Sequence, residues 1–303
     1  MNASSPLRYP GGKQKLTPFL IELLYQNNLV GGHYIEPYAG GAGAAIQLLL
    51  SGFVSTIHLN DSSRAIYAFW QSVLRYPDEL CRLIMSASLT VEEWGRHKYI
   101  LRNSSLFDDL ELGFSTFYLN RVNRSGVLSG GLIGGVNQTG NYKMDARFTR
   151  NELIRRIEAI AMKSHLITIS NQDTEEYLAE CLMQMPENTL IYFDPPYYEK
   201  ASGLYLDYYR KRDHARLAEL IQSIREVKWL LSYDSAPPIF DLYKDRRLFT
   251  YSLQYNASTV YKGTEVFIFC DDLQLPLISK LDYIQAGLNK LHESIRCPQV
   301  ALQ

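Results

Sequence analysis

Short apolar segments alternate with helical patterns along most of this chain of 303 residues. The apolar segments have the length and the β-branched and aromatic content of strands, and helical stretches such as 44–50, 62–74 and 213–225 lie between many of them. This alternation predicts an α/β fold, with a mostly parallel sheet covered by helices on both faces. The expected strands are 34–37, 56–60, 166–170, 189–193, 229–233, 248–255 and 265–270.

The last two expected strands are joined by the polar residues 256–263, which predicts an antiparallel hairpin at the edge of the sheet. Beyond them, residues 275–295 have the pattern of one terminal helix. The sequence therefore predicts a Rossmann-like sheet that is mostly parallel and ends in an antiparallel hairpin.

Residues 77–150 interrupt the alternation of strands and helices. Helical pieces are followed there by the Gly-rich run 129–135 and the polar turn 138–141. Between positions 96 and 156, ten basic residues stand against five acidic ones, although the whole chain has a formal net charge of -1. We expect residues 77–150 to form an inserted, mainly helical and loop-like domain with a surface for a polyanion, and residues 1–76 and 151–303 to form the other domain.

The four cysteines are far apart in sequence and have neither the spacing of metal ligands nor that of a disulfide framework. No apolar stretch approaches the ~20 residues that span a bilayer, and the N-terminus lacks the pattern of a signal peptide. We therefore expect a cytoplasmic protein that binds neither a metal nor a membrane.

The tetrad Asp194, Pro195, Pro196 and Tyr197 directly follows the apolar strand 189–193. Two successive prolines fix φ and remove two backbone donors, so the chain leaves the sheet while its carbonyl groups stay free to accept hydrogen bonds. An acid with free carbonyls beside it can hold an exocyclic amine, whereas a plain turn would have the Asp and Tyr face water. The tetrad alone leaves both interpretations open.

A glycine loop follows the first expected strand, in the sequence Glu36, Pro37, Tyr38, Ala39, Gly40 and onward to Gly43. A strand, a glycine loop and a helix in this order bring bare backbone toward a nucleotide-like ligand. The second strand ends at Asp61, where an acid receives ribose hydroxyls in doubly wound folds. Since the phosphate-binding glycine spacing is absent, the expected ligand is a nucleoside with little or no phosphate.

Two further segments stand out. Asp173 follows the third expected strand and either binds a base or caps the helix that begins near Thr174. Near the N-terminus, a Pro-Gly-Gly turn presents Tyr9 on one side and Lys13 on the other.

In combination, these motifs resemble the Dam-type family of DNA adenine-N6 methyltransferases, in the class that carries Asp-Pro-Pro-Tyr. The chain has Arg-Tyr-Pro-Gly-Gly-Lys, Glu-Pro-Tyr-Ala-Gly-Gly-Ala-Gly, Leu-Asn-Asp and Asp-Pro-Pro-Tyr in the order of that family, with an insertion before the last motif. The resemblance extends from Leu7 to about Phe269. It implies a Rossmann-like methyltransferase fold, S-adenosylmethionine as the cofactor and double-stranded DNA as the partner.

The resemblance also implies roles for individual residues. Asp194, Pro195, Pro196 and Tyr197 would be the catalytic tetrad. The residues expected to bind the cofactor are Tyr9, Lys13, Glu36, Pro37, Tyr38, Gly40, Asp61, Asp173 and Asp194. The segment from Phe117 to Gly126 and the residues Gly140 to Lys143 are similar to the two parts of the family's DNA-contacting loop, which implies DNA contacts by Arg121, Asn123, Arg124, Asn141 and Lys143.

Two departures from the family are visible: the Gly-rich run is not the usual arginine-bearing sequence, and Tyr38 stands where Phe is common. The DNA sequence that is methylated therefore cannot be carried over, and whether a cognate restriction endonuclease accompanies the enzyme stays open.

The tetrad suggests a mechanism for the expected reaction. The Asp194 carboxylate and the Pro195 carbonyl would accept the two hydrogens of adenine N6, with the base flipped out of the duplex and stacked on Tyr197. Two alternatives stay open at this point. One is an amino methyltransferase that acts on RNA or on cytosine N4, and the other is a DNA-binding relative without activity.

Overall fold

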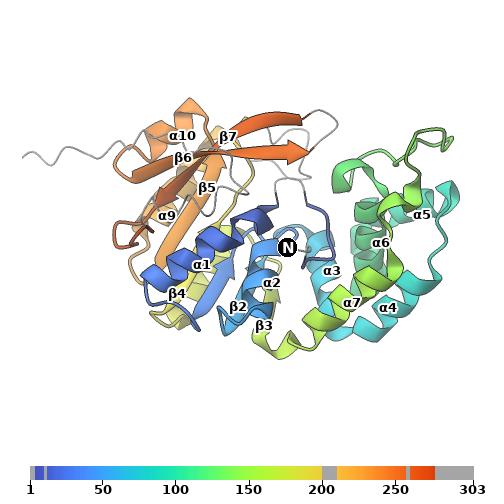
Figure 1. The fold of residues 1–303 in the computed structure, drawn as a ribbon, viewed down its shortest axis with the longest axis horizontal. Coiled ribbons are helices and arrows are strands. Elements are labelled where there is room, and N and C mark those ends of the chain that lie inside the picture. The colour runs from blue at the N-terminus through green and yellow to red at the C-terminus, as the bar shows by residue number, and fades with distance from the viewer. Residues whose placement is uncertain (1–3, 10–11, 200–209, 257–259, 277–303) are drawn as a thin grey trace, which may run out of the picture.

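The protein is described by a computed structural model that covers residues 4–9, 12–199, 210–256 and 260–276. These residues build one sheet with the strand order β3-β2-β1-β4-β5-β7-β6 (Figure 1). The strands are β1 His33–Glu36, β2 Thr56–Asn60, β3 Ile167–Ser170, β4 Thr189–Phe193, β5 Lys228–Asp234, β6 Arg247–Asn256 and β7 Val260–Phe269.

The first five strands are parallel to one another, and β7 is antiparallel to both β5 and β6. The predictions of a mostly parallel sheet and of a terminal antiparallel hairpin are therefore confirmed. The predicted bounds of the loop between these two strands, 256–263, are wrong, because backbone pairing in the hairpin continues to Asn256 and Val260. A long strand pair is held by its backbone hydrogen bonds, so polar side chains do not end it.

Helices connect the parallel strands and pack on the sheet. The first of these, α1 Thr17–Gln26, begins with a proline in its first turn and buries Phe19, Leu20, Leu23 and Leu24. The helices with the expected positions follow within a few residues of the predicted bounds. They are α2 Gly43–Leu50, α3 Arg64–Arg75, α8 Thr174–Cys181 and α9 Lys211–Ser223. The short helix α10 Pro237–Leu242 was not predicted from the sequence. The helix expected at 275–295 lies almost entirely outside the described residues.

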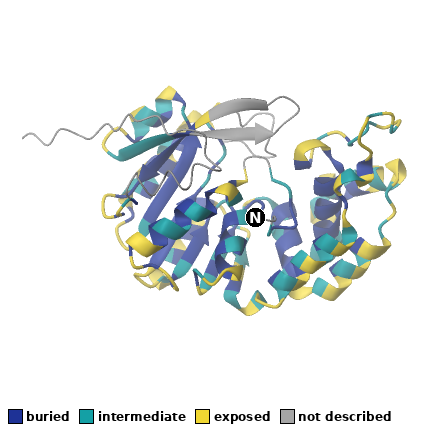
Figure 2. Ribbon diagram, in the orientation of Figure 1, coloured by how far each residue is buried: buried dark blue, intermediate teal, exposed yellow. Residues whose placement is uncertain are grey.

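A group of helices between β2 and β3 stands beside the sheet, at the right of Figure 1. It contains α4 Pro77–Ser86, α5 Val91–Arg102, α6 Asp109–Val122 and α7 Arg150–Ala161. Their outer sides are exposed and their inner sides buried (Figure 2). Apolar side chains of α4, α6 and α7 belong to the same hydrophobic cluster as those of the sheet. The division into a catalytic domain and an inserted recognition domain at 77–150 stays a prediction.

The helical group is attached through a close approach of α6 to α3. A Cβ on Gly113 would lie 2.2 Å from Ser72 Oγ and 2.5 Å from the Ala68 carbonyl oxygen. The Ser72 hydroxyl hydrogen-bonds at 2.8 Å to the carbonyl of Asp109, the first residue of α6. Glycine at position 113 thus lets the two helices touch through their backbones.

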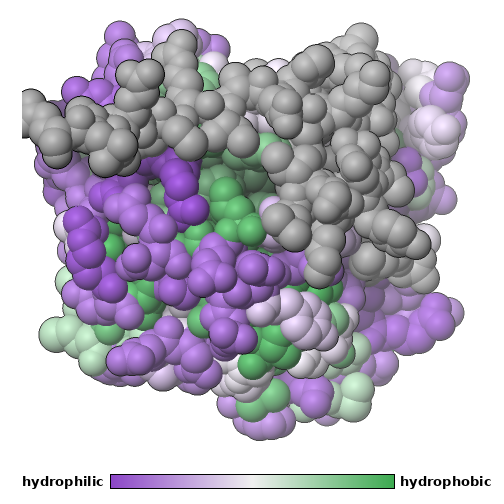
Figure 3. Space-filling model, turned by 60° about the vertical axis from the view of Figure 1, so that its left-hand side comes forward, coloured by the Kyte–Doolittle hydropathy of each residue, from purple (hydrophilic) through white to green (hydrophobic). Residues whose placement is uncertain are grey.

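The face of the molecule in Figure 3 is mostly hydrophilic, with a hydrophobic area near its middle. In the described part of the chain, no helix combines the length and the apolar character that crossing a membrane requires.

Candidate active site

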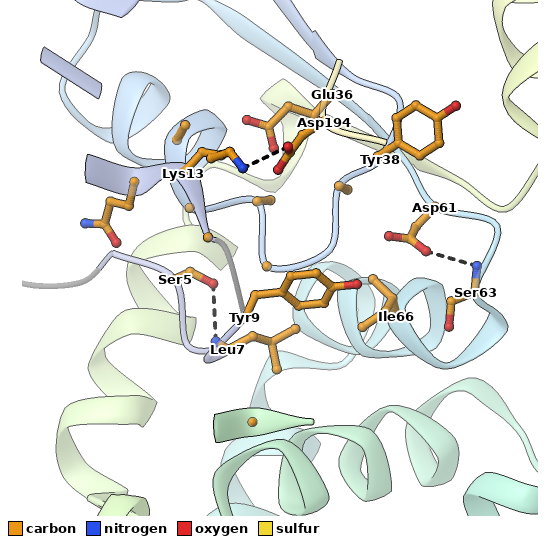
Figure 4. Close-up of a pocket in the computed structure, with 18 of the residues that line it drawn as sticks. Ser5, Leu7, Tyr9, Lys13, Glu36, Tyr38, Asp61, Ser63, Ile66 and Asp194 are labelled. Atoms are coloured by element: carbon orange, nitrogen blue, oxygen red, sulfur yellow. Dashed lines mark hydrogen bonds and ion pairs between the residues drawn. The ribbon is translucent and has the colours of Figure 1, made fainter. Parts of the chain in front are cut away.

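A cavity of about 270 Å³ lies at the carboxyl ends of β1, β2 and β4 (Figure 4). The strand order reverses between β1 and β4, and open α/β sheets bind their ligands at such a point. Residues that follow different strands therefore meet here. Seven of the predicted site residues line the cavity: Tyr9, Lys13, Glu36, Tyr38, Asp61, Asp194 and Pro196.

The loop between β1 and α2 turns its backbone toward the cavity. Gly40 has a φ of +44°, and a Cβ on it would lie 2.7 Å from the Tyr9 ring. The Trp70 indole N–H donates to the Gly40 carbonyl at 2.9 Å, and the next glycine, Gly41, lines the cavity. Only glycine fits between the loop and Tyr9, so the sequence motif is explained by close packing of the N-terminal segment on the loop.

Asp61 connects the ends of the first two strands. Its carboxylate accepts hydrogen bonds from the backbone N–H of Gly40 at 2.8 Å and of Ser63 at 3.0 Å. The Pro37 carbonyl, which does not line the cavity, is held by the Asn60 side chain at 3.1 Å. The acid expected to receive a ribose therefore lies on the cavity wall in a fixed orientation.

Asp173 lies apart from the cavity lining. Its carboxylate accepts from the backbone N–H of Glu175 at 2.9 Å and caps α8. Of the two roles that the sequence left open for this residue, the geometry shows the helix cap.

Glu36 is a buried acid at the end of β1. One of its oxygens accepts from the Tyr34 hydroxyl and from the Ala45 backbone N–H, both at 3.1 Å. Burial raises the pKa of Glu36 to about 8; the Tyr34 hydrogen bond lowers it and the charge of Asp194 raises it. At pH 7 this side chain is therefore mostly protonated in the free protein.

Asp194 follows β4 and has one of its two oxygens engaged. Oδ1 lies 2.9 Å from Lys13 Nζ and accepts from the Ser232 hydroxyl at 2.8 Å. Among the residues that the structure describes, no hydrogen bond reaches Oδ2, and the side chain is 25% exposed. Burial raises the pKa of Asp194; Lys13 opposes this rise and Glu265 adds to it. The carboxylate is thus fixed through one oxygen and open to the cavity.

The remaining tetrad residues lie at different depths. Pro196 lines the cavity, whereas Pro195 and Tyr197 are buried. The Tyr197 hydroxyl donates to Glu265 and accepts from Lys13 Nζ at 2.8 Å. Stacking of a base on the Tyr197 ring stays a prediction.

Sequence reasoning missed two polar residues of the site, Ser232 on β5 and Glu265 on β7. Ser232 is fully buried and connects Asp194 with the Tyr192 hydroxyl, which lies 2.8 Å away. Glu265 is 1% exposed and lies among the buried apolar side chains of β7. An acid followed by the apolar run 266–270 is the signal that would have found it.

The helical group also contributes to the cavity. The cavity lining includes Gly126, Val127, Leu128 and Ser129, which follow α6. Gly126 has a φ of +77°, and a Cβ there would lie 2.3 Å from the carbonyl oxygen of Arg8. The segment before the Gly-rich run is thereby packed on the N-terminal segment.

The predicted DNA contacts fall into two groups. Arg124, Asn141 and Lys143 are exposed. Arg121 and Asn123 are buried, and their side chains bond to backbone carbonyls of Arg147, Pro6, Val127 and Leu128. Burial, and to a smaller extent the nearby Arg8, lower the pKa of Arg121 to about 9. The structure thus shows that Arg121 and Asn123 hold the backbone of nearby segments in place. Contact with DNA stays a prediction for all five residues.

Within the described residues, no group of three or more His, Cys, Asp or Glu side chains is placed to hold a metal ion.

Comparison with protein-family models gives a match over most of the chain. The model of the D12 class N6 adenine-specific DNA methyltransferases matches residues 9–257, which include the glycine loop, the helical group and the tetrad. A search of curated proteins found no match.

Proposed function

Because the chain belongs to the D12 class of N6 adenine-specific DNA methyltransferases, we propose that it transfers a methyl group from S-adenosylmethionine to N6 of an adenine flipped out of double-stranded DNA. The observation that carries this proposal is the position of Asp194 in one cavity with the glycine loop, Glu36 and Asp61. A substrate amine and a nucleoside cofactor need neighbouring sites, and this cavity has residues suited to each.

The cavity fits the proposed cofactor by its chemistry. Gly41, with its bare backbone, the aromatic residues Tyr9 and Tyr38, and the acids Glu36 and Asp61 all line this cavity. Carboxyl groups suit a ligand with a sulfonium and an ammonium group, and Asp61 suits its ribose. When bound, S-adenosylmethionine supplies an electrophilic methyl group on sulfur.

The protein's own part in the reaction is to orient the amine. The lone pair of an adenine amino nitrogen is delocalised into the ring, so the nitrogen is a poor nucleophile. In the proposal, Oδ2 of Asp194 and the Pro195 carbonyl accept the two N6 hydrogens and draw the nitrogen toward tetrahedral geometry. As the N–C bond forms and the C–S bond breaks, one N6 proton is lost, and Asp194 is the base nearest to it.

DNA would approach from the side of the helical group. A base in a duplex cannot reach the cavity, so the proposal includes flipping of the adenine. The exposed Arg124 and Lys143 would contact phosphates, and the 126–129 segment, which lines the cavity, would lie beside the flipped base. Binding that rests on such contacts weakens as salt rises.

One assay tests both the methyl donor and the methyl acceptor. It uses S-adenosylmethionine that is radiolabelled on its methyl group. The protein is incubated with duplex DNA, the separated strands, and RNA of the same sequence, and the label in each polymer is counted. The proposal predicts label in duplex DNA. Label mainly in RNA, or none in any polymer while the protein is folded, would contradict it.

Cofactor binding is expected to release a proton from Glu36. With a pKa of about 8 this side chain is mostly protonated at pH 7 in the free protein. A cationic ligand stabilises the carboxylate and lowers its pKa, so binding expels up to one proton. Affinity therefore rises with pH up to about 8, by at most about tenfold per pH unit.

Titration calorimetry at pH 7 in phosphate and in Tris tests this proton release. The buffer takes up the released proton, and because the two buffers differ in protonation enthalpy, the measured binding enthalpies differ. Glu36→Gln should remove the difference. Glu219→Gln makes the same change at an exposed position on α9 and should keep it. Equal enthalpies in both buffers for the natural chain would show that binding releases no proton and would contradict this prediction.

A further inference from the structure

Glu265 lies beneath the tetrad, on the strand that is inserted between β5 and β6. Its backbone neighbours are Asp234 on β5 and Tyr251 on β6. The side chain is buried, with Oε1 accepting from the Tyr197 hydroxyl and Oε2 from the Tyr251 hydroxyl. Tyr251 is itself fixed by stacking on Phe267, with ring centroids 4.1 Å apart. Both oxygens of the carboxylate are therefore fixed by tyrosines that come from different parts of the chain.

Lys13 joins this carboxylate to Asp194. Its ammonium group lies 3.4 Å from Glu265 Oε2, 2.9 Å from Asp194 Oδ1 and 2.8 Å from the Tyr197 hydroxyl. Burial disfavours the ammonium, but Asp194 and Glu265 outweigh it and hold the pKa of Lys13 well above its ordinary value. Lys13 stays charged, and two carboxylates determine where it lies.

The position of Lys13 has a consequence for Asp194. Lys13 and Ser232 both bind Oδ1, so the carboxylate cannot rotate without breaking two contacts. Oδ2 is the oxygen left for a ligand. Without the Glu265 carboxylate, the flexible Lys13 side chain could adopt other rotamers and bind Oδ2 of Asp194 instead of Oδ1.

Stability alone does not account for an acid at this position. Replacing a buried ionic group by apolar side chains of similar volume is often neutral or stabilising, because charges lose their hydration on burial. This holds when Glu265 and Lys13 are replaced together. With Lys13 present, the carboxylate balances the buried ammonium and accepts from the Tyr197 hydroxyl, so it determines where both side chains lie.

We propose that Glu265 is a positioning residue for methyl transfer: it holds Lys13 and Tyr197 so that Lys13 fixes Oδ1 of Asp194 and leaves Oδ2 to the target amine. This role rests on the proposed function of Asp194. Glu265 itself acts only through Lys13 and the tetrad.

The test is a double-mutant cycle on turnover. Glu265→Gln keeps the volume but places an amide N–H₂ or a weaker acceptor beside the ammonium, so Lys13 shifts. A misplacement of about 1 Å at a reacting group costs on the order of 100-fold in rate, and we expect such a loss of kcat. The change lies away from the nucleoside part of the cavity, so cofactor affinity measured by calorimetry should stay within about threefold.

The second arm of the cycle is Lys13→Gln. If Glu265 acts through Lys13, adding Glu265→Gln to Lys13→Gln causes little further loss of kcat. A general weakening of the fold would instead give effects that multiply, because independent sites are additive in free energy. Multiplying effects would overturn the proposal, as would a kcat of Glu265→Gln equal to that of the natural chain.

Phe269→Leu is the matched control. Phe269 is buried on the same strand as Glu265, four residues further along, and its ring lies beside that of Phe267. It should lower the melting temperature and leave kcat unchanged well below that temperature. Should Glu265→Gln fail to fold, Tyr251→Phe removes one donor to the carboxylate and keeps every charge. A several-fold lower kcat with unchanged cofactor affinity then supports the proposal, and unchanged kcat overturns it.

Asp194→Asn separates this inference from the proposed function. If the natural chain transfers no methyl group, the proposed function fails. If the natural chain is active and Asp194→Asn is inactive, but Glu265→Gln turns over normally, only the role of Glu265 fails.

Discussion

Replacing Asp194 by Asn is expected to lower kcat for DNA methylation by at least about 1,000-fold, the upper range for losing one group that is aimed at the reacting centre. Asparagine has the same size but no charge, and it offers one acceptor in place of two. Lys13 and Ser232 already donate to Oδ1. The amide oxygen will face these donors, which turns its N–H₂ toward the substrate amine, where an acceptor is needed.

Two measurements separate this loss from a loss of binding. Initial rates with methyl-labelled S-adenosylmethionine give kcat, and calorimetry gives the cofactor affinity, which should change by no more than a few-fold. Asp241→Asn, the same change at an exposed position on α10, should keep full activity. A turnover of Asp194→Asn above a few per cent of the natural value would remove Asp194 from its assigned role.

The second large effect is expected for Gly40→Val, which should weaken S-adenosylmethionine binding by at least about 100-fold. A valine Cβ would lie 2.7 Å from the Tyr9 ring, and the φ of +44° is unfavourable for a β-branched residue. Either Tyr9 leaves the cavity wall or the loop moves. The loop also carries Gly41 and contacts Asp61, so both changes alter the surface that would hold the cofactor.

Gly52→Val provides the control for backbone strain. Gly52 has a φ of +75° in the turn after α2, and a Cβ there meets nothing within 4 Å. Both variants should lose stability, by about 1–3 kcal/mol from an unfavourable backbone conformation, and only Gly40→Val should lose cofactor affinity. Calorimetry and thermal unfolding measure the two quantities. Equal affinities for the two variants would show that packing of the loop on Tyr9 does not shape the cofactor site.

Much of the sheet could be predicted from the sequence because buried parallel strands have a strong local signal. β2 and β4 begin and end at the predicted residues, and the hairpin of β6 and β7 is at the predicted edge. The site followed from the same signal, since polar residues directly after parallel strands must meet at one edge. Asp61 and Asp194 were found in this way, whereas the role of Glu36 was implied by the family resemblance.

The contacts that sequence reasoning could not supply join segments that are far apart in the chain. Glu265 becomes part of the site only because β7 pairs between β5 and β6, which brings its side chain to Lys13. Arg121 resembled a DNA contact, yet its guanidinium bonds to the backbone at Pro6 and Arg147. Neither arrangement has a local pattern, because each depends on how segments far apart in the sequence pack together.

The identity of the methylated nucleoside tests the central claim most directly. Duplex DNA is incubated with S-adenosylmethionine and the protein, digested to nucleosides and analysed by mass spectrometry, with Asp194→Asn in parallel. The structure-based account predicts N6-methyladenine with the natural chain and none with Asp194→Asn. N4-methylcytosine as the product, or equal amounts of N6-methyladenine from both proteins, would contradict it.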